Sequence, residues 1–462
     1  MEEQAKVNPL GTERVPRLMR QFSIPSIIAM VIGAVYNLVD QLLIGNVVGT
    51  LGNAATNIVF PMTTICLSLA LMFGIGGAAN FNLTLGRGET DKAAHYIGNS
   101  LVFLVISGVL VCVFTEIFMT PLLGLLGAPD DVFPYAMDYL RITAIGFPFL
   151  ILTTGGCHLI RADGSPRLAM TSTLTGAIIN TVLDALFVVA LGWGMQGAAL
   201  ATIIGQIVSA IIVIVYMFRF KTVPFLAKHL RPIGKYAREM TVVGLAPFFN
   251  QICMMVAQIV LNQSLTYYGA LSVYGSAIPL ACCGIIQKVY QIFYMVIIGL
   301  AQGAQPIESF NYGARQYARV RATYRNAMIV GFIICLAAFA IFRGFPREIL
   351  ELFGSNTEEY FDFGVMFFRI YMLFVWLTFI QPLTSNFFTA IGKPRRGIFL
   401  ALTRQLICFV PLALILPIFF GIEGLLYAQP IADLISAVIA VGMMIVEWRT
   451  LKRMEIAQAE EL

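Results

Sequence analysis

The chain has 462 residues, of which 58% are hydrophobic and only 12% charged, and its formal net charge is +5. Soluble globular domains carry about 45–50% apolar and about 25% charged residues. The composition therefore excludes a water-soluble globular protein, a disordered chain and a nucleic-acid binder with a basic face. Because a membrane-spanning helix needs about 20 apolar residues, we expect an all-α polytopic membrane protein.

Apolar runs bounded by glycine, proline or charged residues predict twelve transmembrane helices. In chain order they lie near residues 18–42, 54–80, 96–119, 133–157, 167–191, 196–218, 241–265, 276–303, 326–345, 362–388, 397–420 and 424–447. A membrane β-barrel would need alternating strands of about ten residues. These runs are continuous and do not alternate.

Lysine and arginine lie mostly in the connections on one side of the predicted membrane. That side holds 24 of the 30 Lys and Arg residues, whereas the opposite connections are mainly acidic. Because basic connections stay in the cytoplasm, we expect both termini in the cytoplasm, which is consistent with an even number of crossings. The expected location is the inner (plasma) membrane.

The two halves of the chain repeat each other at an offset of 227 or 228 residues. The matching pairs are LGRGETDKA (85–93) with YGARQYARV (312–320), RADGSPRLA (161–169) with TAIGKPRRG (389–397), and MQGAALATIIGQI (195–207) with IEGLLYAQPIADL (422–434). A fixed period indicates internal duplication. Repeats of six helices each are parallel, and such halves usually form a cleft that opens alternately to either side of the membrane.

The repeat divides the chain into two lobes and a connection. We predict an N-terminal six-helix lobe at 1–220 that carries a cation-coupling site, a basic cytoplasmic linker at 221–240, and a C-terminal six-helix lobe at 241–462. The linker is interpreted as lying on an anionic membrane surface, with a regulatory or partner-binding role as the alternative.

Polar side chains inside three predicted spans of the first half mark a candidate site, because charges in mid-bilayer cost about 2.5–3.5 kcal/mol each. Spacings of three and four residues place them on single helix faces: Tyr36, Asn37 and Asp40 in the first span, Asn180 and Asp184 in the fifth, and Thr202 and Gln206 in the sixth. Two close carboxylates cannot easily both ionise without a counter-charge, and such oxygens also suit sodium. The site is predicted to take either a proton or Na⁺.

The second half lacks this combination. At the repeat offset Asn180 corresponds to Cys408, Asp184 to Leu412 and Thr202 to Gln429. Coupling is therefore expected in the N-terminal half only. The alternative is that Asp40 and Asp184 are structural, paired with nearby donors or placed at helix ends.

Other polar and helix-breaking residues within the spans carry weaker signals. Lys288, with Gln287 and Gln291, is interpreted as a counter-charge or part of a cavity lining, and Arg404 and Asp433 as a structural pair; Pro25 and Pro247 are candidate hinges or static kinks. The histidines His95 and His229 are placed at loops, and the cysteines form no metal-binding or redox motif.

Three motifs carry a resemblance to a known family: YNLVDQLLIG at 36–45, RADGSPRLAM at 161–170 leading into AIINTVLDALFV, and QPIESFNYGA at 305–314. Over essentially the whole chain, the sequence resembles the multidrug and toxic compound extrusion (MATE) family, in its prokaryotic MepA- and DinF-like branch. The resemblance implies two six-helix bundles that form a V around a central cavity. It also implies multidrug efflux, with cationic or polyaromatic compounds exported in exchange for protons or sodium.

The same resemblance assigns roles to residues of this chain. It implies that Asp40, Asn180, Asp184 and Thr202 form the cation-coupling network, with Tyr36 and Asn37 at neighbouring cavity positions. Some members of the family have a further acid in the seventh and tenth helices, and this chain has none in mid-span there.

The expected function is thus a secondary active antiporter that acts in the bilayer, as a monomer, on small molecules, with no cofactor beyond the coupling ion. The main alternative is a flippase for a lipid-linked sugar, which would need a more cationic central cavity. An intramembrane enzyme would need a nucleophile–base or metal constellation, and no HExxH or Walker A sequence occurs. A channel is the remaining alternative.

Overall fold

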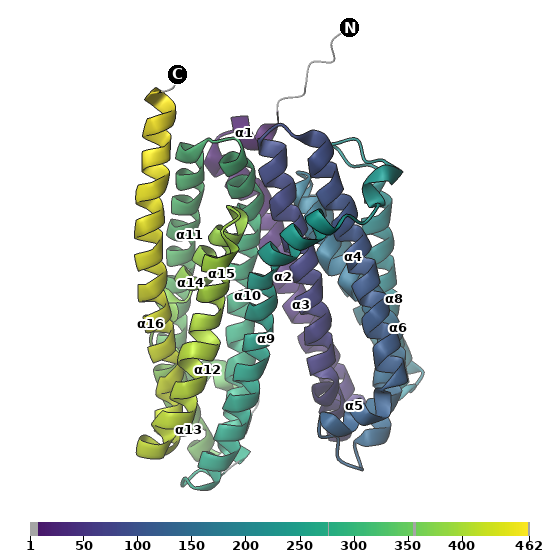
Figure 1. Cartoon of the computed structure of the whole chain (residues 1–462). Helices are drawn as coiled ribbons and strands as arrows, with labels where there is room; N and C mark the ends of the chain where they lie inside the picture. Colours follow the sequence, from purple (N-terminus) through teal and green to yellow (C-terminus); the bar gives the residue numbers. More distant parts are fainter. Residues whose placement is uncertain (1–7, 276, 354–356, 461–462) are drawn as a thin grey trace.

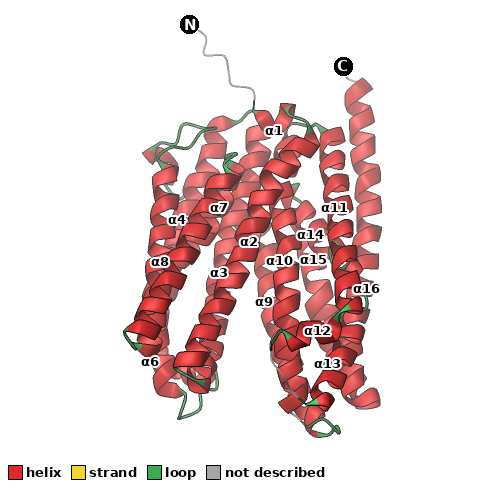
Figure 2. Ribbon diagram, turned by 180° about the vertical axis from the view of Figure 1, so that it is seen from behind, coloured by secondary structure: helices red, strands yellow, loops and turns green. Residues whose placement is uncertain are grey.

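The computed structural model describes residues 8–275, 277–353 and 357–460, and every regular element in these ranges is a helix (Figure 2). The first half contains α1 (Pro9–Thr12), α2 (Val15–Val47), α3 (Thr50–Gly86), α4 (Thr90–Ile117), α5 (Met119–Leu125), α6 (Phe133–Ala162), α7 (Pro166–Asp184), a π-helix (Ala185–Ala190) and α8 (Gly194–Met217). A 3₁₀ helix (Ala227–Leu230) lies in the connection between the halves.

The second half contains α9 (Gly234–Ala270), α10 (Ala277–Gly313), α11 (Tyr317–Gly344), α12 (Pro346–Glu351), α13 (Glu358–Tyr371), a 3₁₀ helix (Val375–Leu377), α14 (Ile380–Ala390), α15 (Pro394–Leu402), a π-helix (Thr403–Phe409) and α16 (Val410–Glu460). Eleven helical stretches in the described ranges are long and apolar enough to cross a membrane. One of them, 394–460, is broken at Gly421, where φ is +58°. Glycine adopts positive φ without strain, so this stretch holds two crossings and the described residues supply the twelve predicted.

Several helices are longer than the apolar runs that predicted them. The clearest case is α9, which begins at Gly234, inside the region expected to be linker. His95 likewise lies within α4, not in a loop as predicted. Polar residues outside the hydrocarbon core can continue a helix, so hydropathy alone underestimates the helix length.

The helices form two bundles, α2–α8 and α9–α16, that touch toward the side of both chain ends and diverge toward the other side (Figures 1 and 2). Across the interface α3 packs on α9, and α10 packs on α2 and α3. Helices α3 and α9 are the second and seventh spans, and α2 and α10 are the first and eighth. Exchanging the two repeats therefore converts the contact of α3 with α9 into the contact of α10 with α2. The duplication inferred from sequence is therefore visible as a two-fold relation between the lobes.

Glycines bring the helices of the two lobes unusually close. A Cβ added at Gly76 of α3 would overlap the carbonyl oxygen of Met240, and one added at Gly244 of α9 would overlap that of Met72. A Cβ at Gly303 of α10 would overlap the backbone of α2. Small residues allow backbones to approach within a membrane, so these positions hold the lobes together on one side.

Candidate functional site

Asp40 of α2 and Asp184 of α7 bring their carboxyl groups within hydrogen-bonding reach of each other. Asp184 is 1% exposed and is the last residue of α7, where the chain passes into the π-helix Ala185–Ala190. Single-turn π-helices are frequent at functional sites because they re-aim side chains. The two predicted acids, 144 positions apart in sequence, therefore meet inside the N-terminal lobe.

Most carboxylate oxygens of this pair lack a hydrogen-bond partner among the described residues. Both carboxylate oxygens of Asp184, Oδ1 of Asp40 and Oδ1 of Asn180 are buried without a hydrogen-bond partner in the described structure. Buried polar atoms are normally satisfied, so each exception needs an explanation. These four oxygen atoms, three of them from carboxylates, fit a proton shared between the acids or a hard cation such as Na⁺.

Neutral polar groups complete the surroundings of the pair. The Asn180 side-chain amide donates to Thr202 Oγ1 at 3.4 Å, which joins α7 to α8. The phenol groups of Tyr36 and Tyr139 lie close enough to both carboxylates to interact with them electrostatically. Tyr139, on α6, was not anticipated from the sequence.

The remaining predicted cavity residues form no hydrogen bond with the acid pair among the described residues. Asn37 donates to the Gly33 carbonyl at 2.8 Å within α2, and Gln206 lies against Gly146 of α6. On α10 of the other lobe, Gln287 donates to the Tyr371 hydroxyl at 2.8 Å. Its neighbours Lys288 and Gln291 are half-buried and exposed, respectively, with no side-chain hydrogen bond among the described residues.

The C-terminal lobe contains a charged cluster of a different kind. Arg404 Nε donates to Asp433 Oδ1 at 2.8 Å, and both side chains are almost fully buried. Gln429 donates to the same carboxylate oxygen at 2.9 Å, and Arg404 also donates to the Tyr290 hydroxyl. This carboxylate already has a permanent cation and donors, so it does not need a mobile ion.

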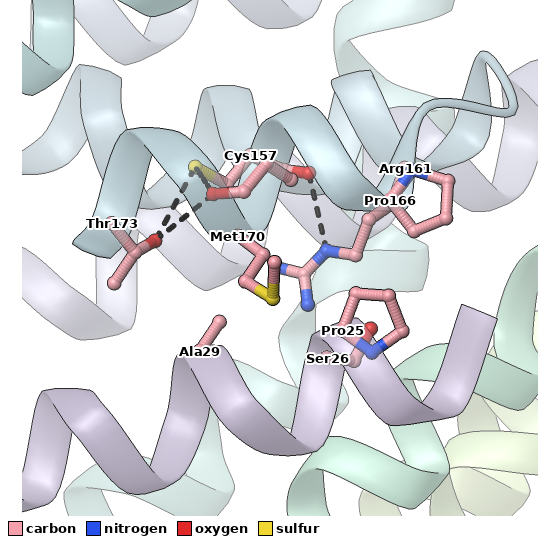
Figure 3. A pocket seen from close by; sticks show the side chains of 9 residues that line it. Pro25, Ser26, Ala29, Cys157, Arg161, Pro166, Met170 and Thr173 are labelled. Carbon is pink, nitrogen blue, oxygen red and sulfur yellow. Dashed lines mark hydrogen bonds between the residues drawn. The ribbon is translucent and has the colours of Figure 1, made fainter. Parts of the chain in front are cut away.

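A buried arginine links the two lobes beside Pro25 (Figure 3). Arg161, at the end of α6, donates from Nε to the Cys157 carbonyl at 3.1 Å and from Nη1 to Gln302 Oε1 of α10 at 2.5 Å. No carboxylate forms a salt bridge with Arg161 in the described residues. Pro25 and Pro247 both lie inside uninterrupted helices, α2 and α9, so their proposed hinge role stays a prediction.

Two of the three histidines meet near the basic connection. His95 and His229 pack edge to face, with ring centroids 4.8 Å apart, and Asp91 lies beside both. The Leu226 amide donates to His229 Nδ1 at 3.0 Å, so the ring proton is on Nε2, which faces Asp91 at 3.2 Å. A neutral histidine that donates through Nε2 has no lone pair there for a metal. The cluster therefore anchors the connection to α4 and does not suit a metal ion.

Comparison with known proteins agrees with this architecture. A family model described as MatE matches residues 25–186 and 246–415, one segment in each lobe. Over 429 residues the chain is 25% identical to the multidrug export protein MepA of Staphylococcus haemolyticus (strain JCSC1435), covering 92% of each protein. It is 24% identical over 425 residues to MepA of Staphylococcus aureus (strain MSSA476), again covering 92% of each.

The fold is also similar to solved structures. One is described as the outward-facing conformation of a multidrug resistance MATE family transporter of the MOP superfamily. It superposes with a TM-score of 0.89 at 24% identity, covering 96% of this chain and 98% of that chain. The similarity extends over both six-helix lobes.

Proposed function

Because the chain belongs to the MatE family, we propose that it is a secondary active antiporter that exports cationic and lipophilic drugs in exchange for protons or sodium ions. Members of this family are transporters and not enzymes. The relatives named as multidrug export proteins span 92% of this chain, which supports the same class of substrate here. Substrates would bind between the diverging halves of the two lobes.

The observation that carries the coupling mechanism is the set of unsatisfied oxygens around Asp40 and Asp184. When both acids are ionised and no cation is bound, the site holds two close negative charges away from bulk water, which is unfavourable. Loading a proton or Na⁺ removes that repulsion and changes the preferred packing of α2 against α7. A ligand shifts a conformational equilibrium by as much as its affinities for the two states differ.

The sidedness in this proposal rests on the basic connections, which support cytoplasmic termini. The lobes touch on the side of the termini (Figure 1), so in this orientation the structure is closed toward the cytoplasm and opens outward. The protein acts as a monomer in the inner membrane in this proposal, and each lobe moves largely as a rigid body.

A flippase for lipid-linked sugars is the alternative, and it requires cations that face the central space to bind pyrophosphate. Of the two cations expected within the spans, Arg404 is already neutralised by Asp433 at 2.8 Å, which leaves Lys288. One lysine within the spans is a poor match for a pyrophosphate, so the antiporter is better supported.

The experiment is transport by the full-length protein in proteoliposomes, with proton and sodium gradients imposed separately and a cationic dye as substrate. We expect dye movement driven by one of the two gradients and abolished when that gradient is collapsed. Dye movement that persists without either gradient, or that needs ATP, would contradict the proposal. Movement of a fluorescent lipid-linked sugar without dye transport would favour the flippase.

A further inference from the structure

A basic cleft lies between the lobes on the side of the chain termini. It has a volume of about 790 Å³ and is open to solvent. It is lined from the N-terminal lobe by α3, Arg87 and Tyr96, and from the C-terminal lobe by the start of α9 and the turn before α15. Three of its lining residues are cations: Arg87, Lys235 and Arg238. They come from both lobes, so the cleft exists only while the lobes are together.

These three cations have no carboxylate partner, unlike their neighbours. On the adjoining turn Lys393 and Arg396 both bind the buried carboxylate of Glu447, and Lys92 binds Glu89 at 2.8 Å. No salt bridge or side-chain hydrogen bond involves the three cleft cations among the residues that the structure describes.

The single carboxylate in the lining does not balance them. Glu239 accepts a hydrogen bond from the Tyr96 hydroxyl across the lobe interface. With three cations and one carboxylate, the lining retains two positive charges. Like charges from opposite lobes repel each other, so the cleft opposes the lobe contact unless an anion enters it.

The start of α9 adds backbone donors to the same cleft. Gly234 and Lys235 are the first residues of this helix and both line the cleft, and the helix has no side-chain cap. The first amide groups of a helix lack partners and favour an anion. Arginine, lysine and free amides together match the multiple acceptor oxygens of a phosphate group.

We propose that this cleft binds a phosphate group that bridges Arg87 of the N-terminal lobe to Lys235 and Arg238 of the C-terminal lobe. The group belongs either to the headgroup of an anionic lipid or to a free phosphate compound of the cytoplasm. Bound there, it neutralises the repulsion across the interface and favours the arrangement that is closed on this side. The site is separate from the coupling acids and does not depend on the transported substrate.

The test measures binding to the purified full-length protein with two probes, dioleoylphosphatidylglycerol and inorganic phosphate, against dioleoylphosphatidylcholine as the zwitterionic reference. The cleft variant is R87Q/K235Q/R238Q. The matched control is R219Q/K452Q/R453Q, which removes the same charge from exposed positions outside the cleft. All six side chains are exposed and unpaired, so both variants are expected to fold.

At about 1 kcal/mol for each basic residue, the cleft variant should bind on the order of a hundredfold more weakly, while the control binds like the wild type. Saturable binding of phosphatidylglycerol alone assigns the site to a lipid headgroup, and saturable binding of inorganic phosphate assigns it to a soluble compound. Equal binding by wild type and cleft variant, equal loss in both variants, or no saturable binding of either probe would overturn the proposal.

Discussion

Gly86 and Gly313 occupy equivalent positions in the two repeats, 227 residues apart, and each lies against the helix of the other. They are the last residues of α3 and α10. A Cβ at Gly86 would overlap the carbonyl oxygen of Phe310, and a Cβ at Gly313 would overlap that of Leu83. Leu83 and Phe310 are also equivalent in the repeats, so the contact is two-fold symmetric.

The first prediction concerns this crossing. Gly86→Ala should destabilise the closed arrangement by about 1–3 kcal/mol, because a methyl group must displace backbone that cannot move locally. We expect slower export and a larger fraction of molecules open toward the termini, measured by the reactivity of an engineered interface cysteine. Gly442→Ala is the control, since a Cβ there meets no atom within 4 Å. Equal reactivity in both variants would show that the crossing does not limit closure.

The second prediction concerns the acid pair. Asp184→Asn keeps the side-chain shape and removes the charge, so the protein should fold and insert while gradient-driven export is lost. Asp138→Asn, at an exposed position on α6, is the control and should transport normally. The readout is dye movement in proteoliposomes, with size-exclusion profiles to check folding. Undiminished transport by Asp184→Asn would remove this carboxylate from the mechanism.

The third prediction tests Tyr139. Its phenol lies near both acids, and a polar group acts more strongly on a nearby charge in a low-dielectric interior than in water. Tyr139→Phe should therefore change the ion concentration needed for half-maximal transport, with little effect on thermal stability. The control is Tyr135→Phe, which is 36% exposed on the same helix. An unchanged ion dependence would assign Tyr139 to packing alone.

The fourth prediction separates stability from coupling in the C-terminal lobe. Removing one partner of the buried Arg404–Asp433 pair should cost about 3–5 kcal/mol, because the other charge stays buried and unpaired. The double variant Arg404→Met/Asp433→Leu should recover much of the loss in thermal stability and retain ion-driven transport. If the double variant folds but its transport is no longer ion-driven, this pair also takes part in coupling.

The sequence was most informative where a pattern had a direct physical cause. The break near Gly421 was predicted from two apolar runs separated by a few residues, and the backbone at Gly421 is non-helical. Asp40 and Asp184 were found because isolated acids in apolar spans are costly. The lobe contacts were not predictable in detail, but the repeat offset already implied their symmetry.

Other features of the structure could not be predicted from the sequence. Tyr139 is one of 17 tyrosines in an aromatic-rich chain, and only the packing of α6 places it at the acids. The meeting of His95 and His229 depends on the path of the connection back over α4. The basic cleft combines residues from both lobes. The lack of salt-bridge partners for its cations in the described part of the chain can be recognised only from the three-dimensional structure.

After Gly421 the last helix continues without a break to Glu460, which is about 58 Å at 1.5 Å per residue. A bilayer with its headgroups is about 40–45 Å thick, so this rod extends well beyond the membrane surface on the flank of the C-terminal lobe (Figure 1). A fluorescent reporter fused beyond residue 460 would thus be carried rigidly by one lobe. Paired with a dye on the other lobe, it would turn each transport cycle into an optical signal without disturbing the interface itself.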